Sequence, residues 1–351
     1  MRHSAAYLGD KLNQTTYWSP LLIKLVTFGE TMVQYNARYT GPYRESTDYL
    51  MDCAGAESNV VVNIGKLNIP RTETTWISRL GDDEAGNLIQ KELEGKTRVV
   101  APCYEGENTG ISYLNHHEDG EHVKTYFRKG SAASRLTFDE VQPHLMGCDL
   151  LHVTGITPAL SETCRDTIFR TLHCTASTNT PVSFDLNYRE PLWDSNDAKP
   201  IFEEMLSMSS IFKLGYDEAE MIWRRGWSAE QYARHFQNLN RGIVIITLGS
   251  DGALAFDGST TVSDPGFIVN VVDPVGAGDA FVAGLLGGIV QNSKPRKFLD
   301  LDPIARVPYL RAALRIANVC GALACTRRGD TAAMPTMNGV EKFLSHNGIL
   351  N

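Results

Sequence analysis

Paired cysteines are missing from this sequence, and so are metal-binding arrangements of histidine. The seven cysteines are scattered and form no Cys-x-x-Cys pair. The nine histidines show none of the spacings that hold zinc. Because an odd, scattered set of thiols is typical of a reducing compartment, we expect free cysteines and a cytoplasmic location.

Long apolar runs and an excess of basic residues are missing too. The longest early apolar run, Leu21–Phe28, is too short to cross a bilayer, and residues 1–20 carry no apolar segment of a signal peptide. These first residues are polar and aperiodic, so we expect a mobile extension. The formal net charge of −8 gives no basic surface for nucleic acid or for an anionic membrane. We expect neither as a partner, and an anionic substrate would need positive groups gathered locally.

The composition is that of an ordinary globular protein. With 42% hydrophobic and 21% charged residues, a chain of 351 residues can bury one large α/β core with an appendage. Short β-branched runs alternate with helical stretches, and we expect strands at Leu21–Phe28, Thr74–Ser78, Leu150–Val153, Val182–Asp185, Ile211–Leu214 and Ile243–Thr247. This alternation predicts a Rossmann-like, mostly parallel sheet covered by helices on both faces. Ligands of such a sheet gather at the carboxyl ends of its strands.

Two other segments predict a small β-sheet lid. Residues 31–54 carry several tyrosines among polar and turn residues, a pattern that suits short, partly exposed strands. Residues 109–130 hold two alternating segments separated by Asp119-Gly120, a strong hairpin signal. We therefore expect one α/β domain over residues 21–351, with these two segments forming its lid.

The strongest candidate for a functional site in the sequence is the segment Asp273-Pro-Val-Gly-Ala-Gly-Asp279. We expect a strand at Phe267–Val272 before it and a buried helix at Ala280–Val290 after it. Its two glycines have no Cβ, so the backbone can approach a ligand and point N–H groups at an anion, above all phosphate. Asp279, in the first helical turn, could accept the proton of an attacking hydroxyl. A plain turn with a capping aspartate explains the same residues, and both interpretations stay open here.

Four segments together resemble the ribokinase-like (PfkB) carbohydrate kinases. They are Ala54-Gly-Ala-Glu-Ser-Asn59, Asp185-x-Asn187-x-Arg189, Leu248-Gly-Ser-Asp-Gly-Ala253 and Asp273-Pro-Val-Gly-Ala-Gly-Asp-Ala-Phe281, and they follow the family's order and spacing. The resemblance covers residues 21–335. It implies a ribokinase-like α/β domain with a small lid, which transfers the γ-phosphoryl group of ATP to a sugar hydroxyl. It makes Asp279 the expected catalytic base and the N–H groups of Gly276, Ala277 and Gly278 the expected phosphate donors.

Within the family, the segments Gly29–Met32, Thr125–Ser134 and Asn187–Arg189 are similar to 2-keto-3-deoxygluconate kinases. That resemblance implies a substrate site made of Gly55, Asn59, Tyr126, Arg128 and Arg189. The expected reaction converts 2-keto-3-deoxygluconate into 2-keto-3-deoxy-6-phosphogluconate. The chemistry fits, because this substrate is a carboxylate and guanidinium groups bind carboxylates through two parallel hydrogen bonds. The structural alternative for Arg128 is an ion pair with an acidic neighbour in the lid.

The resemblance also implies where the nucleotide and the metal ions bind. The expected nucleotide neighbours are Asn187, Thr247, Gly249, Gly252 and Asn318. Glu218 would organise Mg²⁺ through water, with an ordinary first-turn helix glutamate as the alternative. Relatives hold a monovalent cation through backbone carbonyls at the positions of Asp273 and Val275, so K⁺ stays open.

The chain departs from the family's usual residues at three of these sites. Ala54 stands in place of a glycine, Pro274 in place of a threonine, and Gly215 in place of a polar residue. We still expect phosphoryl transfer despite these departures, but they leave open which sugar acid is the substrate.

Two other functions stay open from the sequence. A fructokinase-like enzyme would use the same fold on a neutral sugar, and a regulator could bind sugar or nucleotide without turnover. The intact Gly276-Ala-Gly-Asp279 favours an enzyme. The expected partners are a sugar acid, ATP and a second copy of the chain, since exposed lid strands invite pairing between subunits.

Overall fold

A computed structural model describes residues 22–42, 48–118 and 122–349 of the chain. The expected mobile extension at residues 1–20 and the expected turn at Asp119-Gly120 lie outside the described residues.

The main sheet of the described chain is mostly parallel, as expected. In spatial order its strands are β15 (Thr261–Asp264), β14 (Ala253–Phe256), β13 (Ile243–Thr247), β12 (Ile211–Gly215), β11 (Val182–Asp185), β10 (Leu150–Thr154), β1 (Ile23–Phe28), β4 (Thr72–Ile77) and β6 (Arg98–Val100). The strands from β13 to β6 pair in parallel, and β14 and β15 pair antiparallel at one edge. The carboxyl ends of the parallel strands therefore meet along one edge of the sheet, where ligands are expected.

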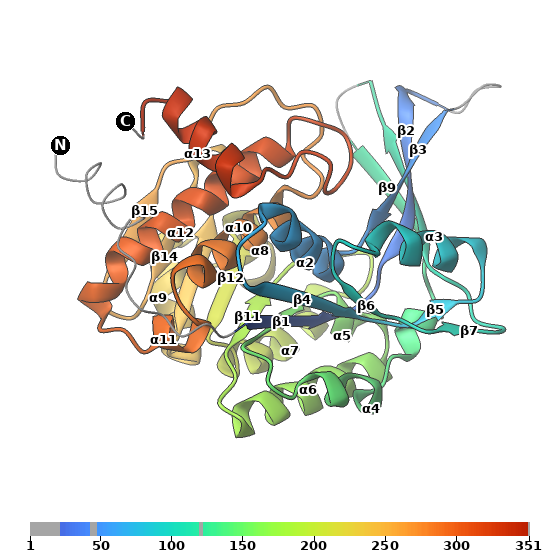
Figure 1. The fold of residues 1–351 in the computed structure, drawn as a ribbon, viewed down its shortest axis with the longest axis horizontal. Coiled ribbons are helices and arrows are strands. Elements are labelled where there is room, and N and C mark those ends of the chain that lie inside the picture. The colour runs from blue at the N-terminus through green and yellow to red at the C-terminus, as the bar shows by residue number, and fades with distance from the viewer. Residues whose placement is uncertain (1–21, 43–47, 119–121, 350–351) are drawn as a thin grey trace.

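Helices cover both faces of this sheet (Figure 1). One face packs against α4 (Phe138–Val141), α6 (Glu162–Ser177), α7 (Ser195–Ser207), α8 (Tyr216–Trp223) and α9 (Ala229–Asn240). The other packs against α2 (Ala56–Leu67), α10 (Ala277–Asn292), α11 (Pro295–Leu299), α12 (Pro303–Ala324) and α13 (Met337–His346). Short helical segments lie at α5 (Thr157–Leu160), Ala132–Arg135, Gln142–His144 and Gly249–Asp251.

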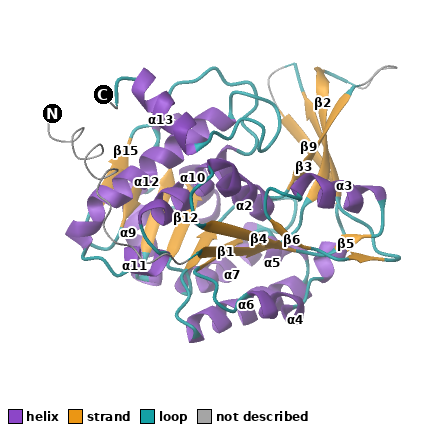
Figure 2. Cartoon of the chain, viewed as in Figure 1, coloured by secondary structure: helices purple, strands orange, loops and turns teal. Residues whose placement is uncertain are grey.

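A second, smaller sheet projects from the main domain beside α3 (Glu84–Leu93), as Figures 1 and 2 show. Its strands, in spatial order, are β3 (Tyr49–Ala54), β2 (Met32–Thr40), β8 (Ile111–His116) and β9 (His122–Phe127). A separate two-stranded pair joins β5 (Leu80–Gly81) to β7 (Cys103–Tyr104). We call the four-stranded sheet the lid, and it uses the two segments that the sequence predicted for it.

Helix α10 is apolar on nearly every side because it is buried between its neighbours and the sheet. A Cβ at Gly284 would lie 2.8 Å from Cα of Ala317, and one at Gly288 would lie 2.8 Å from Cα of Ala313. These glycines therefore let α10 and α12 approach more closely than larger residues would allow. The tight packing fixes the N-terminus of α10, which carries the glycine-rich turn.

The strand expected at Phe267–Val272 is wrong: these residues form an irregular loop. Strand β15 ends at Asp264, directly before Pro265, and no strand of the described chain pairs with the segment that follows. Ile268 is 99% exposed and Val271 is 60% exposed, so the run is apolar but not core. The glycine-rich turn is thus entered from a loop, and α10 begins at Ala277 instead of Ala280.

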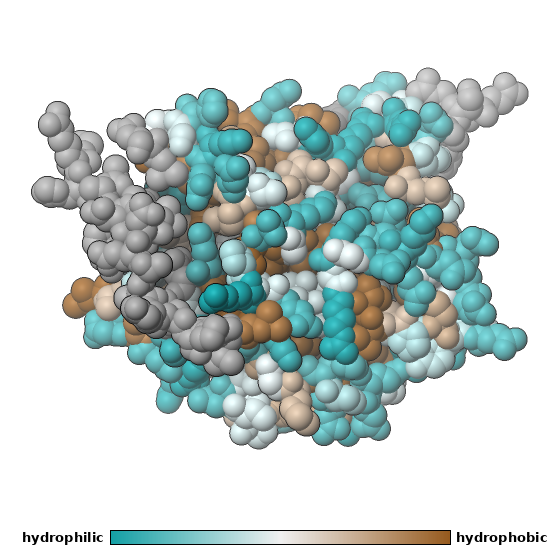
Figure 3. Space-filling model, viewed as in Figure 1, coloured by the Kyte–Doolittle hydropathy of each residue, from teal (hydrophilic) through white to brown (hydrophobic). Residues whose placement is uncertain are grey.

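No helix in the described ranges is long and apolar enough to span a bilayer. The face seen in Figure 3 carries mostly polar residues, with apolar ones scattered between them.

Candidate active site

Two cavities lie on either side of the glycine-rich turn. The first has a volume of about 460 Å³ and lies between the lid and the carboxyl ends of the strands; the second, of about 400 Å³, lies over β13 and α12. Pro274 and Gly278 line both cavities. A group bound in one cavity can therefore meet a group bound in the other at this turn.

The turn itself is built to bring backbone N–H groups to that meeting point. Gly276 caps α10 with a left-handed φ of 81°. The helix starts at Ala277, whose N–H donates to the carbonyl of Pro274 at 3.3 Å, while no described carbonyl accepts from the N–H groups of Gly278 and Asp279. With the helix dipole they attract an anion such as phosphate.

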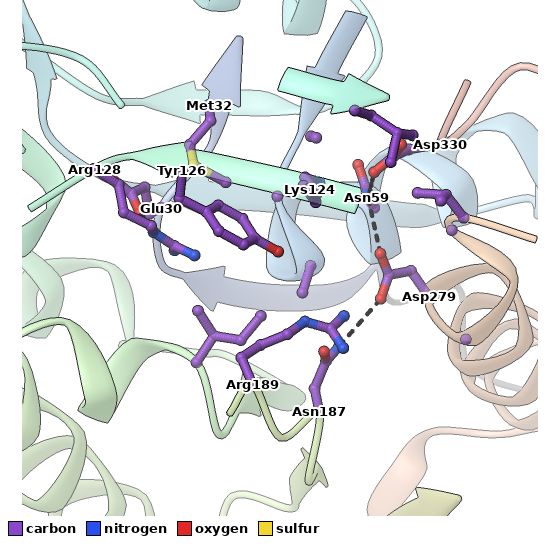
Figure 4. A pocket seen from close by; sticks show the side chains of 18 of the residues that line it. Glu30, Met32, Asn59, Lys124, Tyr126, Arg128, Asn187, Arg189, Asp279 and Asp330 are labelled. Carbon is purple, nitrogen blue, oxygen red and sulfur yellow. Dashed lines mark hydrogen bonds and ion pairs between the residues drawn. The ribbon is translucent and has the colours of Figure 1, made fainter. Parts of the chain in front are cut away.

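Asp279 lies at this helix start with both carboxylate oxygens in use. Oδ2 accepts a hydrogen bond of 2.8 Å from Nδ2 of Asn59, and Oδ1 accepts one of 3.3 Å from Nδ2 of Asn187 (Figure 4). Burial raises the pKa of Asp279 to about 7, the hydrogen bond from Asn59 opposes the rise, and the charges of Asp330 and Asp185 add to it. A carboxylate with a pKa near neutrality suits a general base.

The five residues expected to contact the substrate, Gly55, Asn59, Tyr126, Arg128 and Arg189, all line the first cavity. Figure 4 shows Tyr126 and Arg189 extending toward its middle, with Asp279 on one side and Arg128 on the other. The cavity thus has a cationic part and an acidic part.

Arg128 is held by an ion pair with Glu30, the residue two positions after β1. Nε and Nη2 of Arg128 lie 2.6 and 2.5 Å from Oε2 of Glu30. The pairing alternative expected for Arg128 is therefore present, although the acid comes from the main domain and not from the lid. No described residue accepts a hydrogen bond from Nη1 of Arg128, which leaves one edge of the guanidinium for a ligand.

Arg189 is exposed, and its only hydrogen bond within the described chain runs from Nη1 to the carbonyl of Tyr188 at 3.4 Å. Lys124 from β9 adds a third cationic side chain, with Nζ 5.6 Å from the ring centroid of Tyr126. These two cations form no ion pair in the described ranges, so both can donate to an anionic ligand in the cavity.

Asn187 lies in the first cavity, whereas the sequence suggested a place beside the nucleotide. Its φ of 41° is in the left-handed region, which costs free energy for a residue other than glycine. This conformation holds Nδ2 against Asp279. We infer that Asn187 supports Asp279, while a contact with nucleotide stays a prediction.

The other four expected nucleotide neighbours line the second cavity: Thr247, Gly249, Gly252 and Asn318. Nδ2 of Asn318 donates to the carbonyls of Asp264 and Pro265, at 3.0 and 3.3 Å, so its amide nitrogen is already occupied. The rest of the lining is largely apolar, including Phe267, Ile268 and Val271 of the irregular loop. Such a lining suits a flat heteroaromatic group.

The carboxylates of the two expected metal neighbours, Glu218 and Asp273, already accept hydrogen bonds from the protein. Glu218 accepts hydrogen bonds from the backbone N–H groups of Gly215 and Tyr188, at 2.7 and 2.9 Å, in the manner of a helix-capping residue. Asp273 is buried and accepts from the N–H of Val275 at 3.1 Å and from Asn36 at 3.2 Å. The described residues contain no group of three or more His, Cys, Asp or Glu side chains able to hold a metal ion.

Three charged residues that line the first cavity were not among those expected from the sequence: Glu30, Lys124 and Asp330. A fourth, Lys213, is buried beside Asp185 at 3.1 Å, and its Nζ would lie 3.5 Å from a Cβ at Gly278. Its ammonium group is therefore next to the anion-binding turn. A lysine inside a predicted strand is the only signal the sequence gave for it.

The family model of pfkB family carbohydrate kinases matches residues 22–337. A 2-dehydro-3-deoxygluconokinase of Bacillus subtilis is 32% identical over 91% of this chain and 95% of its own length. A 2-dehydro-3-deoxygalactonokinase of Haloferax volcanii is 29% identical over 92% of this chain and 96% of its own length. A fructokinase of Oryza sativa is 27% identical over 97% of this chain and 98% of its own length.

A solved structure of a related protein has the same fold as this chain. The crystal structure of a fructokinase from Vibrio cholerae, in fructose, ADP and calcium ion bound form, has a TM-score of 0.77 and 24% sequence identity. The match covers 92% of this chain and 99% of that one. The ribokinase-like fold expected from the sequence is confirmed.

Proposed function

This chain belongs to the pfkB family of carbohydrate kinases, and we propose that its sugar substrate is a 2-keto-3-deoxy sugar acid. The chain is an enzyme that phosphorylates a carbohydrate. The finer assignment is phosphorylation of 2-keto-3-deoxygluconate on its primary hydroxyl, which gives 2-keto-3-deoxy-6-phosphogluconate. The observation that carries it is that two cations of the first cavity, Arg189 and Lys124, form no ion pair in the described chain.

The substrate lies in the first cavity with its carboxylate toward the cationic side chains and its primary hydroxyl toward Asp279. Arg189, Lys124 and the free edge of Arg128 supply donors to the carboxylate. Tyr126 lies between Lys124 and Arg128 on the lid, where its ring can cover the sugar chain. A neutral sugar would leave these cations without a partner.

Asp279 acts as the general base toward the attacking hydroxyl. A carboxylate with a pKa of about 7 cannot fully deprotonate an alcohol, whose pKa resembles the ~15.7 of water. The proton therefore moves to Asp279 late, as the new bond to phosphorus forms. Asn59 and Asn187 keep the carboxylate in one orientation during this step.

ATP occupies the second cavity with its γ-phosphate at the turn. The N–H groups of Gly276, Ala277, Gly278 and Asp279 offset charge on the phosphate oxygens, as preorganised donors do in other enzymes. Lys213, beside Gly278, adds a positive charge at the same point. Thr247, Gly249, Gly252 and Asn318 surround the nucleoside.

Mg²⁺ bound to the phosphates would neutralise charge that develops during transfer. Glu218 lines the first cavity and would reach the ion through water, because its carboxylate also holds two backbone N–H groups. Backbone carbonyls near Asp273 and Val275 would hold K⁺ if the enzyme uses it.

A fructokinase-like activity is the second candidate, and one observation favours it. The charge of Arg128 is already compensated by Glu30, so one of the two arginines expected to bind a carboxylate is only partly free for it. The fructokinase among the relatives covers almost the whole chain.

A coupled kinase assay over a panel of sugars separates the two candidates. The panel contains 2-keto-3-deoxygluconate, 2-keto-3-deoxygalactonate, fructose and ribose, each with ATP and Mg²⁺. We expect kcat/KM for one of the two acids to exceed that for fructose by at least ~10-fold, the value of one charged contact. A higher kcat/KM for fructose would reject the acid and leave the second candidate.

The outer face of the lid is a further place for a partner, and we propose a second copy of this chain there. Tyr35 and Tyr113 stack at 5.0 Å between ring centroids, Phe127 meets Tyr113 at 6.0 Å, and Phe127 is 59% exposed. Aromatic side chains are enriched at protein interfaces, and here one exposed ring packs on a stacked pair of partly buried ones. Sedimentation of the full chain and of Phe127→Asp tests this: a monomeric parent would reject it.

The proposed location is the cytoplasm. All seven cysteines are free in the structure, which agrees with a reducing compartment.

A further inference from the structure

We propose that Asp330 is a positioning residue for phosphoryl transfer, which acts on Asp279 through the side chain of Asn59. The inference rests on the proposed role of Asp279 as the base, and it holds whichever sugar is the acceptor.

One amide nitrogen joins the two carboxylates. Nδ2 of Asn59 donates at 2.8 Å to Oδ2 of Asp279 and at 3.0 Å to Oδ2 of Asp330. An amide nitrogen has two hydrogens, so these bonds use both of them. The orientation of Asn59 is therefore fixed from two sides, and Asn59 in turn fixes one oxygen of Asp279.

Asp330 is itself held firmly and lies in the wall of the active site. It is 5% exposed and lines the first cavity. Its other oxygen, Oδ1, accepts a hydrogen bond of 3.0 Å from Nε2 of Gln34 on the inner face of the lid. Asp330 thus connects a lid strand to the base by way of one asparagine.

The backbone of Asp330 also supports the glycine-rich turn. A Cβ on Gly276 would lie 2.5 Å from the carbonyl oxygen of Asp330 and 2.9 Å from its Cα. Arg328, two positions before Asp330, donates from Nη1 to the carbonyl of Ala37 in β2, at 3.0 Å. The loop after α12 therefore contacts the lid, the turn and the base network together.

The charge of Asp330 also acts on Asp279, because it raises the pKa of that carboxyl group. The charged groups that influence Asp279 are Asp330 on this loop, Asp185 on β11, Lys213 on β12 and Arg189 after β11. Asp330 and Asp185 raise the pKa of Asp279, and Arg189 lowers it. Asp330 is the one of the four that also shares a hydrogen-bond donor with Asp279.

Two substitutions separate geometry from charge. Asp330→Asn keeps an oxygen to accept from Asn59, and Gln34 can turn its amide so that Oε1, which has no partner, accepts from the new amide group. Asp330→Ala removes both acceptor and charge. Asp139→Asn is the matched control, because it also removes one carboxylate charge, but from a side chain of α4 that is 83% exposed and lies outside the first cavity.

The experiment measures kcat, the KM values for both substrates and the pH profile of kcat/KM, with whichever sugar of the panel is turned over. In Asp330→Asn the acidic limb is expected to move to lower pH by about half a unit or more, because a neighbouring negative charge is lost. In Asp330→Ala, kcat is expected to fall between ~10- and 100-fold, part of what a positioned base contributes, with KM for ATP unchanged. Asp139→Asn should match the parent in both measurements.

Other results would overturn the proposal. If the limb of Asp330→Asn coincides with that of the parent, Asp330 does not act on the base. If only KM for the sugar rises, Asp330 serves the sugar hydroxyls instead. Asp279→Asn is measured alongside: retained turnover there would reject the base itself, whereas its loss together with an unchanged Asp330→Asn profile rejects only the role of Asp330.

Discussion

Arg128 in the lid and Glu30 in the main domain form a buried ion pair, with Nη2 of the arginine 2.5 Å from Oε2 of the glutamate. The side chains are 7% and 1% exposed. The second carboxylate oxygen of Glu30 accepts a hydrogen bond of 2.5 Å from the hydroxyl of Ser131. The pair therefore joins the end of β9 to the end of β1, beside the first cavity, and its loss should affect stability as well as substrate binding.

Removing one partner of this pair is predicted to cost more stability than removing both. Arg128→Met leaves the carboxylate of Glu30 buried without its cation, which typically costs about 3–5 kcal/mol. In the double variant Glu30→Gln, Arg128→Met no buried charge remains, so we expect much of that loss to be regained. Urea unfolding of the parent, the single variant and the double variant measures these free energies. Equal stabilities for the single and double variants would contradict the prediction.

Arg189→Ala is predicted to weaken binding of a sugar acid selectively. This side chain is exposed and makes no ion pair in the described chain, so its removal breaks none. A charged hydrogen bond contributes about 1.5–3 kcal/mol, so KM for 2-keto-3-deoxygluconate should rise ~10- to 100-fold while that for fructose barely changes. Arg311→Ala, on the exposed side of α12, is the control. An equal rise in KM for the acid and for fructose would indicate a neutral-sugar kinase.

The glycine-rich turn could be predicted from the sequence because its residues are adjacent in the chain. Gly276 to Asp279 carry their own conformational and chemical signals, and the strands that surround them show as β-branched runs. Asp330 carries no such signal, because its contact with Asn59 spans 271 positions. The pairing of Glu30 with Arg128 spans 98 positions and shows only once the lid is folded over the main domain.

The wrong strand at Phe267–Val272 has a physical explanation as well. A β-branched pattern reports that a segment would fit a sheet, but it cannot report whether an edge is available for pairing. Here the main sheet ends at β15, and the apolar side chains of this segment instead line the second cavity. The same limit explains Asn187, since a strand end places a residue at the ligand edge without saying which cavity it faces.

Gly276→Ala and Gly278→Ala are predicted to differ in their effects. Alanine at position 276 would have to keep a φ of 81° and would place its Cβ 2.5 Å from the carbonyl oxygen of Asp330. We expect a loss of about 1–3 kcal/mol in stability, with kcat lowered as well. Alanine at position 278 meets only Nζ of Lys213, at 3.5 Å, so stability should hold while the methyl group hinders the phosphate. Thermal unfolding and kcat of both variants check this, and equal melting temperatures would contradict it.

Asp279→Asn is predicted to lower kcat by about 10² to 10⁴, the contribution of a positioned general base. Asparagine has nearly the same shape but cannot accept the proton of the attacking hydroxyl. Because Asp279 lines only the first cavity, calorimetric ATP binding should match that of the parent. Turnover near that of the parent would reject the assignment of the base.

The pH dependence of the parent follows from the pKa of about 7 at Asp279, raised from an ordinary value of 3.8 by burial. The base works deprotonated, so kcat/KM should rise with pH up to about 7 and then level off. The folded state holds this proton more tightly than the unfolded state, so Asp279 makes the protein less stable as pH rises from about 4 to about 7. Asp279→Asn has no such proton, and its stability advantage over the parent should therefore grow across that interval. Urea unfolding at several pH values measures the difference, and a constant difference between the two proteins would show that Asp279 ionises at its ordinary pKa.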